Sequence, residues 1–294
     1  ALRQSAGGLK TPWLKAAFVF FLVGFGTKMG LGPLHTWLPD AHSEAPSAVS
    51  ALLSGAMLNV AFVALWRAHQ VCVAAGLGAF SGELLTGFGL LSVGIAALFL
   101  LGAADYKRML AYSSIEHRGL LALGLGAGAP GAAAALFHAV NHSLTKCALF
   151  LTAGRILDAT GTKRIADARG LARALPATSA VWLIGLFAIS GAPPFGVFFS
   201  ELRIFQAVFR DGRWGVGLAA LWLLAAAFAG ILRAGLRMTA GDSDTGAATP
   251  SGRRLSPWAD LAPAVGLLAI AALIGLRLPA FLSGAINAAA GGLP

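Results

Sequence analysis

Residues 18–50 read FVFFLVGFGTKMGLGPLHTWLPDAHSEAPSAVS, and this stretch decides the class of fold. It begins as an apolar run typical of a membrane helix, and then carries Lys28 and the helix-breaking residues Gly30, Gly32 and Pro33. A charge at the centre of a bilayer costs about 2.5–3.5 kcal/mol on insertion scales, so it usually faces a protein interior or a water path. Helix breaks at that depth need protein or water to satisfy the freed backbone groups. The stretch therefore predicts a broken membrane helix beside an ion or proton site, with a snorkelling lysine on a kinked packing helix as the alternative.

The composition is that of a polytopic membrane protein. The chain has 294 residues, of which 57% are hydrophobic and 12% charged, whereas soluble domains carry roughly 25% charged residues. The net charge of +10 therefore indicates basic loops on the cytoplasmic side of a membrane rather than a nucleic-acid partner. Cys72 and Cys147 lack the spacing of a metal or redox motif. The chain shows no nucleotide, cysteine-cluster or flavin fingerprint, so we expect no cofactor bound by this chain and no independent oxidoreductase.

About eight stretches approach the roughly 20 apolar residues that a bilayer requires, and none predicts a strand. The expected fold is an all-α polytopic membrane protein. The first span continues past its break as a half-helix, and the sixth is interrupted at a second Gly/Pro cluster formed by Gly191, Pro193, Pro194 and Gly196. The predicted spans are 15–31, 48–66, 83–101, 109–128, 132–157, 176–208, 214–237 and 258–278.

Two Gly/Pro-interrupted spans in corresponding places are typical of inverted repeats around a central ion site. We expect residues 1–70 to be the end of a first repeat, and 82–238 to be a second five-helix repeat with its broken helix at 176–209. A soluble loop at 239–257 and a C-terminal helix and tail at 258–294 complete the organisation. The beginning of the first repeat is then missing, so we expect the chain to be the C-terminal part of a longer polypeptide.

The distribution of basic residues predicts the orientation in the membrane. Eleven Lys and Arg residues fall in loops on one face, against seven on the other. The richer face should be cytoplasmic. Its basic residues are Lys107, Arg108, Arg155, Lys163, Arg164, Arg169, Arg173, Arg233, Arg237, Arg253 and Arg254.

The fifth span holds the densest group of chemically active residues. His138, His142 and Lys146 recur every four residues, so they share one helical face over about 12 Å. Histidine titrates near neutral pH, and such a row with Ser143 and water between its members predicts a lateral proton path. One alternative is that these side chains only form hydrogen bonds that hold neighbouring helices together. Zinc is another, but no Glu or Cys stands at a completing position, and we expect no metal.

The remaining signals are weaker. Glu201 is an ionisable residue shortly after the second break, and His35 lies within the first. Asn59 is a water ligand on the path or a packing hydrogen bond, and both interpretations stay open. His117 is a further candidate, although Glu116 and His117 are also compatible with a local pair on one helix.

Four blocks of the sequence resemble one known family. They are GTKMGLGPLHTWLPDAHSEAPSAVSALLSG, ADYKRMLAYSSIEHRG, FHAVNHSLTKCALFLTAG and SGAPPFGVFFSEL. Together they resemble the antiporter-like membrane subunits shared by respiratory complex I, membrane-bound hydrogenases and Mrp-type cation/proton antiporters. The sequence of the first block is most similar to the branch of hydrogenase-4 component F and formate hydrogenlyase.

The resemblance implies a fold and a set of roles. Fourteen helices with two inverted five-helix repeats are usual in this family, and the spans here look like the last eight. Lys28 falls on the family's central lysine, His138, His142 and Lys146 on its His/Lys helix, and Glu201 on its terminal Lys-or-Glu position. The glutamate partner of the central lysine lies on an earlier helix that this chain lacks, and Asn59 stands where several relatives have Lys or His.

The sequence therefore predicts a proton-translocating membrane subunit of a redox-driven complex, in a prokaryotic inner membrane. The implied partners are other membrane subunits and a peripheral redox module with iron–sulfur, NiFe or flavin centres. A subunit of a secondary cation/proton antiporter is the alternative, and a structural anchor whose polar residues only pack helices is a third interpretation.

Overall fold

The computed structural model describes residues 6–240 and 257–291. Within these ranges the chain is helical, and strand-type pairing is confined to one isolated bridge between Asp105 and Arg164. The predicted all-α class is confirmed. Nearly all of the predicted soluble loop at 239–257 lies outside the described residues.

One short 3-10 turn precedes the long helices, and a five-residue π-helical segment interrupts one of them. The elements are η1 (Ala6–Gly8), α1 (Thr11–Met29), α2 (Trp37–Glu44), α3 (Ser47–Leu52), the π segment η2 (Leu53–Met57), α4 (Leu58–Ala74), α5 (Gly78–Leu101), α6 (Tyr106–Gly126), α7 (Gly128–Thr160), α8 (Leu171–Ala174), α9 (Pro176–Ile189), α10 (Gly196–Arg210), α11 (Trp214–Thr239), α12 (Pro257–Leu276) and α13 (Ala280–Ala290).

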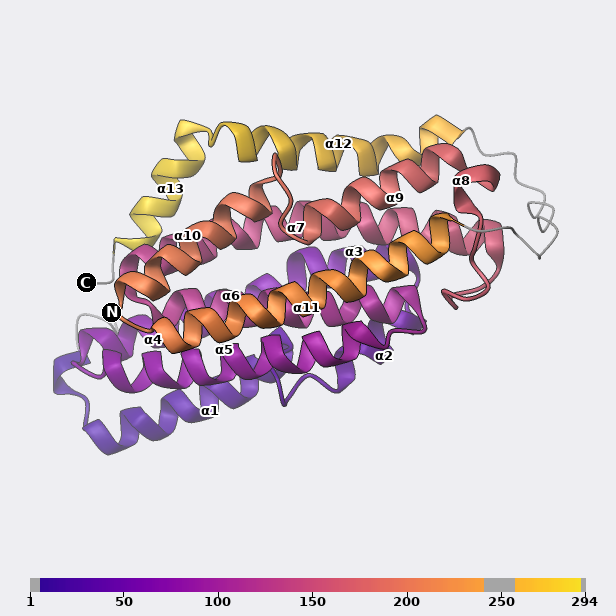
Figure 1. Ribbon diagram of the computed structural model, residues 1–294. Helices are drawn as coiled ribbons and strands as arrows, with labels where there is room; N and C mark the ends of the chain where they lie inside the picture. Colours follow the sequence, from indigo (N-terminus) through magenta and orange to yellow (C-terminus); the bar gives the residue numbers. More distant parts are fainter. Residues whose placement is uncertain (1–5, 241–256, 292–294) are drawn as a thin grey trace.

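The long helices lie side by side in an elongated bundle, with α1 and α12 at opposite edges (Figure 1). Helix α6 packs against α5 and α7, and α7 in turn contacts α3, α9, α10 and α12. Almost every residue of α6 is buried, although the helix carries Glu116, His117 and Arg118. Because a buried charge needs polar partners, this pair of central helices defines where a polar site can form.

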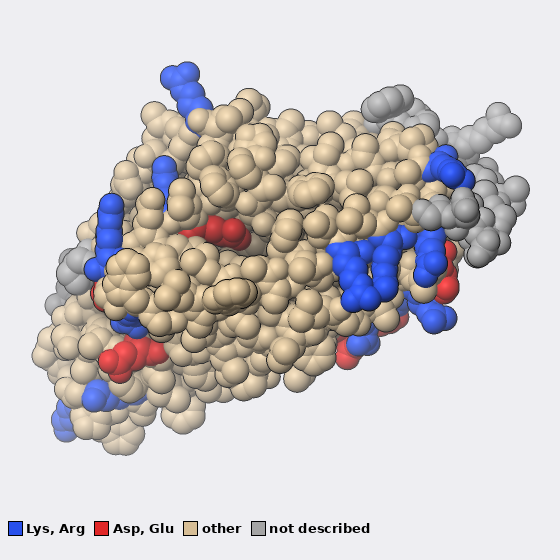
Figure 2. Space-filling model, viewed as in Figure 1, with Lys and Arg blue, Asp and Glu red and all other residues tan. Residues whose placement is uncertain are grey.

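Charged side chains gather at the two ends of the bundle. Figure 2 shows a long uncharged middle on the visible face, broken by one acidic patch in a hollow. At one end the Tyr106 amide donates to Lys163 O at 3.1 Å, and Lys107 Nζ donates to Ala45 O at 2.7 Å. Lys163 Nζ also pairs with Glu44 at 2.8 Å, and its hydrogen bond lowers the pKa of that exposed carboxyl. Loops that the charge pattern assigned to one face of the membrane therefore do lie together.

The first predicted break lies between α1 and α2. Gly30 ends α1 with a left-handed φ of 85°, which a glycine adopts without strain. The amide of Gly32 donates to Ser92 Oγ at 2.8 Å, and Trp37 Nε1 donates to Thr27 O at 2.7 Å. Protein groups thus satisfy part of the backbone that the break exposes, as a membrane setting requires.

The second predicted break lies between α9 and α10. Gly191 has a φ of 72°, and α12 closes over the break from outside. A Cβ on Gly275 of α12 would lie 2.6 Å from Gly196 N and in collision with Pro194 O. The helical structure is thus interrupted at both predicted Gly/Pro positions, while the assignment of each flanking pair of helices to one membrane span stays a prediction.

The predicted spans correspond to helices, with differences at the ends. The second span is longer than predicted, running from Ser47 to Ala74, and it contains the unpredicted π segment. Helix α13 was not predicted either; it turns by 73° from α12. Within the described residues, three helices are long and apolar enough to cross a membrane, or up to four if the bent α12–α13 pair is one span. The count of eight spans stays a prediction.

Close backbone approach between α5 and α6 gives a test of this packing. A Cβ on Gly89 would lie 2.8 Å from Gly119 O, and one on Gly119 would lie 2.6 Å from Gly89 O. Gly89→Ala should therefore push the helices apart and destabilise the fold by about 1–3 kcal/mol. Gly87→Ala, on the same helix with no atom within 4 Å of its added methyl group, should cause no loss. Equal thermal unfolding midpoints for both variants in detergent would contradict this packing.

Candidate functional site

The central helices α6 and α7 bring a cluster of buried and half-buried polar side chains together, which we call the central cluster. Helices α4 and α10 and the π segment complete it. Its members are Ser54, Asn59, Ser113, Ser114, Glu116, His117, Arg118, His138, Asn141, His142, Ser143, Lys146, Ser200 and Glu201.

The three predicted residues of α7 lie in this cluster. His138, His142 and Lys146 are fully buried. They do not form a continuous row along α7 alone, because His117 of α6 lies between the two histidines. The His117 ring centroid is 5.0 Å from that of His138 and 5.0 Å from that of His142, which are 6.4 Å from each other. The row of imidazoles is therefore shared by two helices.

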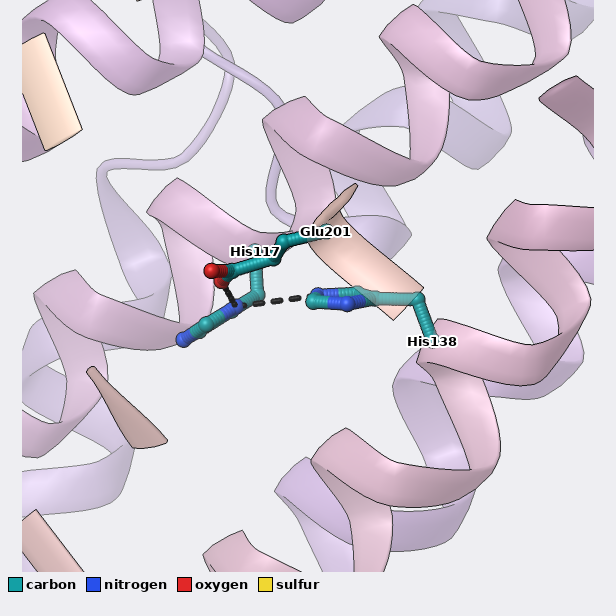
Figure 3. A group of neighbouring side chains, drawn as sticks. All are labelled: His117, His138 and Glu201. Carbon is teal, nitrogen blue, oxygen red and sulfur yellow. Dashed lines mark hydrogen bonds and ion pairs between the residues drawn. The ribbon is translucent and has the colours of Figure 1, made fainter. Parts of the chain in front are cut away.

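His117 is the hub of the cluster. Its Nδ1 lies 3.0 Å from His138 Nε2 and 3.7 Å from Glu201 Oε1, as Figure 3 shows. The other ring nitrogen of His138, Nδ1, lies 2.9 Å from Ser200 Oγ. Glu201 is thus joined to the histidines through His117, which the sequence named only as a secondary candidate.

Lys146 lies further along α7 and is held by α6. Its ammonium group donates to Leu110 O at 2.6 Å and to Ser113 Oγ. Glu116 interacts electrostatically with Lys146 and also with Glu201. The His117 imidazole approaches His138 and Glu201, while Glu116 Oε2 has no hydrogen-bond partner among the described residues.

Arg118 is the principal member of the cluster that the sequence analysis missed. Its guanidinium is fully buried and donates to Asn59 Oδ1, to Ser54 O at 3.0 Å and to His142 Nδ1 at 3.0 Å. The signal was available, because Arg118 lies inside an otherwise apolar predicted span, the same argument that singled out Lys28. A guanidinium only donates hydrogen bonds, so His142 Nδ1 must accept, and neutral His142 carries its proton on Nε2.

Asn59 makes packing hydrogen bonds. Its amide donates to Ser143 Oγ at 2.6 Å and to Gly55 O at 3.0 Å, while its oxygen accepts from Arg118. Ser143 in turn donates to Gly55 O at 2.7 Å. Of the two interpretations left open for Asn59, the structure supports a hydrogen bond between helices.

Lys28 and His35 are not brought into the central cluster. Lys28 is exposed, and its ammonium group lies 5.8 Å from the centroid of the Trp37 ring. His35 is buried beside Tyr112, with ring centroids 6.5 Å apart. The two breaks therefore differ in position: the first lies beside Lys28, whereas the second reaches the cluster.

Two glycines place the second break against the central cluster. A Cβ on Gly191 would collide with the carboxylate of Glu201, and one on Gly196 would collide with the side chain of Asn141. Only a residue without a side chain leaves room for these polar groups. The predicted glycines thus serve the site as well as the bend.

The cluster also contains a possible set of metal ligands. One ligand atom from each of His117, His138 and Glu201 lies within 4.8 Å of the other two. The sequence argument against zinc looked for a completing Glu or Cys near the histidine pair on one helix. The carboxylate comes instead from α10 and the second imidazole from α6, so that argument does not hold.

The fold and the site together define a polytopic helical membrane protein, in which interrupted helices surround the central cluster of titratable side chains. Residues 3–228 match the family described as "NADH:quinone oxidoreductase/Mrp antiporter, TM". The chain belongs to this family.

Three similar proteins agree with this assignment. A hydrogenase-4 component F homolog from Methylacidiphilum infernorum is 42% identical over 233 residues, covering 79% of this chain and 49% of that protein. The membrane-bound sulfane sulfur reductase, an archaeal respiratory membrane complex, has a chain with a TM-score of 0.86 at 25% identity, covering 99% of this chain and 59% of that one. Respiratory complex I from Thermus thermophilus has one with a TM-score of 0.82 at 28% identity, covering 97% and 60%. The chain thus spans about half the length of the curated relative.

The hydrogen bond between Ser200 and His138 is testable through stability. Ser200→Ala leaves the buried Nδ1 of His138 without its partner, which should cost about 1–3 kcal/mol. Thr152→Val is the matched control, because the Thr152 hydroxyl donates to a carbonyl of its own helix, Ala148 O. Thermal unfolding in detergent should show a lower midpoint for Ser200→Ala than for Thr152→Val. Indistinguishable midpoints would refute the bond.

Proposed function

We propose that this chain forms the proton-translocating part of a membrane subunit in a redox-driven complex, either a membrane-bound hydrogenase or an NADH dehydrogenase-like enzyme. The observation that carries the proposal is the central cluster. It places His117, His138, His142 and Glu201 beside one another, with Lys146 buried one turn further along α7. Ionisable residues inside a membrane protein are costly and usually mark ion or proton pathways.

Proton transfer through His117 follows from its geometry. An imidazole can accept a proton on one nitrogen and release one from the other. Nδ1 of His117 faces both Glu201 and His138, and the ring also interacts with the backbone of Ile189 at the end of α9. Buried polar atoms are nearly always satisfied by protein or ordered water. We therefore place bridging water beside His142 Nε2, which has no hydrogen-bond partner within the described part of the chain.

Fixed charges would set the direction of transfer. Arg118 stays protonated under accessible conditions, so it disfavours a second positive charge on His142, to which it donates a hydrogen bond. Lys146 donates to Leu110 O and Ser113 Oγ of α6 in the same cluster. A charge change at one end of the cluster alters proton affinity at the other. Moving one proton against 100 mV requires about 2.3 kcal/mol, which interactions between close buried charges can supply.

The wider assembly follows from the same proposal. Electron transfer takes place in a peripheral redox module with iron–sulfur, NiFe or flavin centres, and this chain binds no redox cofactor. Other membrane subunits lie beside it in a prokaryotic inner membrane. The eight spans, the two inverted repeats and the cytoplasmic position of the basic loops are parts of this proposal.

A cation/proton antiporter subunit is the second candidate, because the matching family description names both classes. The two are separated by what drives the protons. The interior of inverted membrane vesicles that contain the complete complex should become more acidic when an electron donor is added in the absence of a sodium gradient. Acidification only in response to an imposed sodium gradient would favour the antiporter.

Lys146→Ala should abolish most electron-driven proton transfer while the complex still assembles, because it removes the ionisable group at one end of the central cluster. Lys107→Ala is the matched control: Lys107 is also a buried lysine, but it donates to Ala45 O at the end of the bundle. It should leave transfer per assembled complex near the wild-type rate. Vesicle acidification and complex abundance are measured in the same preparation. Loss of assembly in Lys146→Ala, with transfer per complex unchanged, would indicate a packing role.

Lys28 is proposed to exchange protons with a group outside the described residues, since its side chain is exposed at the first break. Lys28→Arg should then lose nearly as much proton transfer as Lys28→Ala, because arginine stays protonated. Lys10→Arg, at an exposed position before α1, is the control and should have no effect. Near-normal coupled transfer in Lys28→Arg would show that this lysine does not titrate.

A further inference from the structure

The triad His117, His138 and Glu201 has the geometry of a metal site. Its members come from α6, α7 and α10 and point toward one another (Figure 3). His117 Nδ1 lies 3.0 Å from His138 Nε2 and 3.7 Å from Glu201 Oε1. Tetrahedral zinc with bonds of about 2.0–2.2 Å places its donors about 3.4 Å apart. These two distances bracket that value, and all three ligand atoms lie within 4.8 Å of one another, so side-chain shifts that draw Glu201 toward His138 would complete the site.

The donor set selects a class of metal. Two imidazole nitrogens and one carboxylate oxygen, with a fourth position for water, are a known set for Zn²⁺. Calcium and magnesium instead take six or more oxygen ligands, so they are disfavoured here. The donor atoms thus favour a metal ion of intermediate softness, such as Zn²⁺.

The surroundings of His138 support this assignment independently. If His138 binds the ion through Nε2, its Nδ1–H is free to donate to Ser200 Oγ, which lies 2.9 Å away. A metal-bound histidine usually donates its second ring N–H to an oxygen acceptor in this way, which fixes the ring and its tautomer. Ser200 is therefore already in place as the supporting residue.

Access to the triad is through Glu201. Both histidines are buried, whereas 14% of the Glu201 side chain is exposed. Its carboxylate lies against Gly191 in the break between α9 and α10. An ion can thus meet Glu201 first and reach the histidines by displacing the hydrogen bond between them.

Neighbouring charges make binding reversible rather than permanent. The Arg118 guanidinium repels a cation from close by, since it donates to His142, whose ring centroid lies 5.0 Å from that of His117. Metal binding also requires neutral histidines and an ionised carboxylate, so affinity should fall as the pH is lowered. The ion competes with protons for the same lone pairs.

We propose that His117, His138 and Glu201 form a reversible Zn²⁺-type site, and that an ion bound there stops proton transfer through His117. The binding stands on the geometry alone; the inhibition rests on the proposed function. While the lone pair of His117 Nδ1 coordinates the ion, that nitrogen can neither accept a proton from a neighbouring group nor donate one to it.

The binding test uses the complete complex in detergent, stripped with a chelator that leaves its tightly held centres intact. Zn²⁺ and Mg²⁺ are titrated by calorimetry into wild type, His138→Gln, Glu201→Gln and the control His69→Gln, whose histidine bonds Ser81 instead. We expect one Zn²⁺ site that each triad variant weakens at least about tenfold, that His69→Gln keeps and that Mg²⁺ does not fill. Equal affinity in wild type and both triad variants would overturn the site.

A milder variant guards against misfolding. Ser200→Ala retains all three ligands and should still weaken Zn²⁺ binding by about tenfold or more through loss of the supporting oxygen. Unchanged affinity in Ser200→Ala would refute the role given to that residue. Vesicle acidification is then measured with and without Zn²⁺. Binding without inhibition would leave the site standing and exclude His117 from the proton path, whereas no binding would remove the site and leave the proposed function untouched.

Discussion

The arrangement of the core depends on the hydrogen bonds that the buried guanidinium of Arg118 donates. It joins Asn59 of α4, Ser54 of the π segment and His142 of α7 to its own helix α6. A charge taken out of water costs several kcal/mol unless hydrogen bonds compensate it. Three elements must therefore keep their acceptors around one planar group. The π segment is part of this solution, because its Ser54 O accepts from Arg118, and π turns are frequent at functional sites.

The need to bury charge also explains why the bundle has an inside and an outside. Helices α6 and α7 carry the ionisable groups, and neither meets the criterion of an apolar span, whereas α5 and α11 meet it and pack beside them. In a bilayer there is no hydrophobic force between helices, so close packing and polar contacts hold them together. The glycine crossing of α5 with α6 and the central cluster supply one of each.

How far the sequence predicted this structure differs between its parts. The lengths of the apolar stretches and the positions of Gly and Pro were sufficient to predict both interruptions and nearly all the long helices, because these signals are local. The π segment and α13 escaped, since neither has a local signature of its own. Within the site, the face shared by His138, His142 and Lys146 followed from spacing. The partners did not: which helix supplies His117 between two histidines, or Glu201 opposite His117, depends on packing between segments far apart in the chain.

The two helix breaks look equivalent in the sequence and are not equivalent in space. Each is built from Gly and Pro, and each has an ionisable residue nearby. At the second break, Gly191 and Gly196 give room to Glu201 and Asn141, so the bend and the central cluster form one unit. At the first, Ser92 and Trp37 satisfy the backbone, and Lys28 remains on the surface. A shared pattern of residues therefore specifies a shared bend, whereas the chemistry at each bend depends on which side chains the neighbouring helices bring to it.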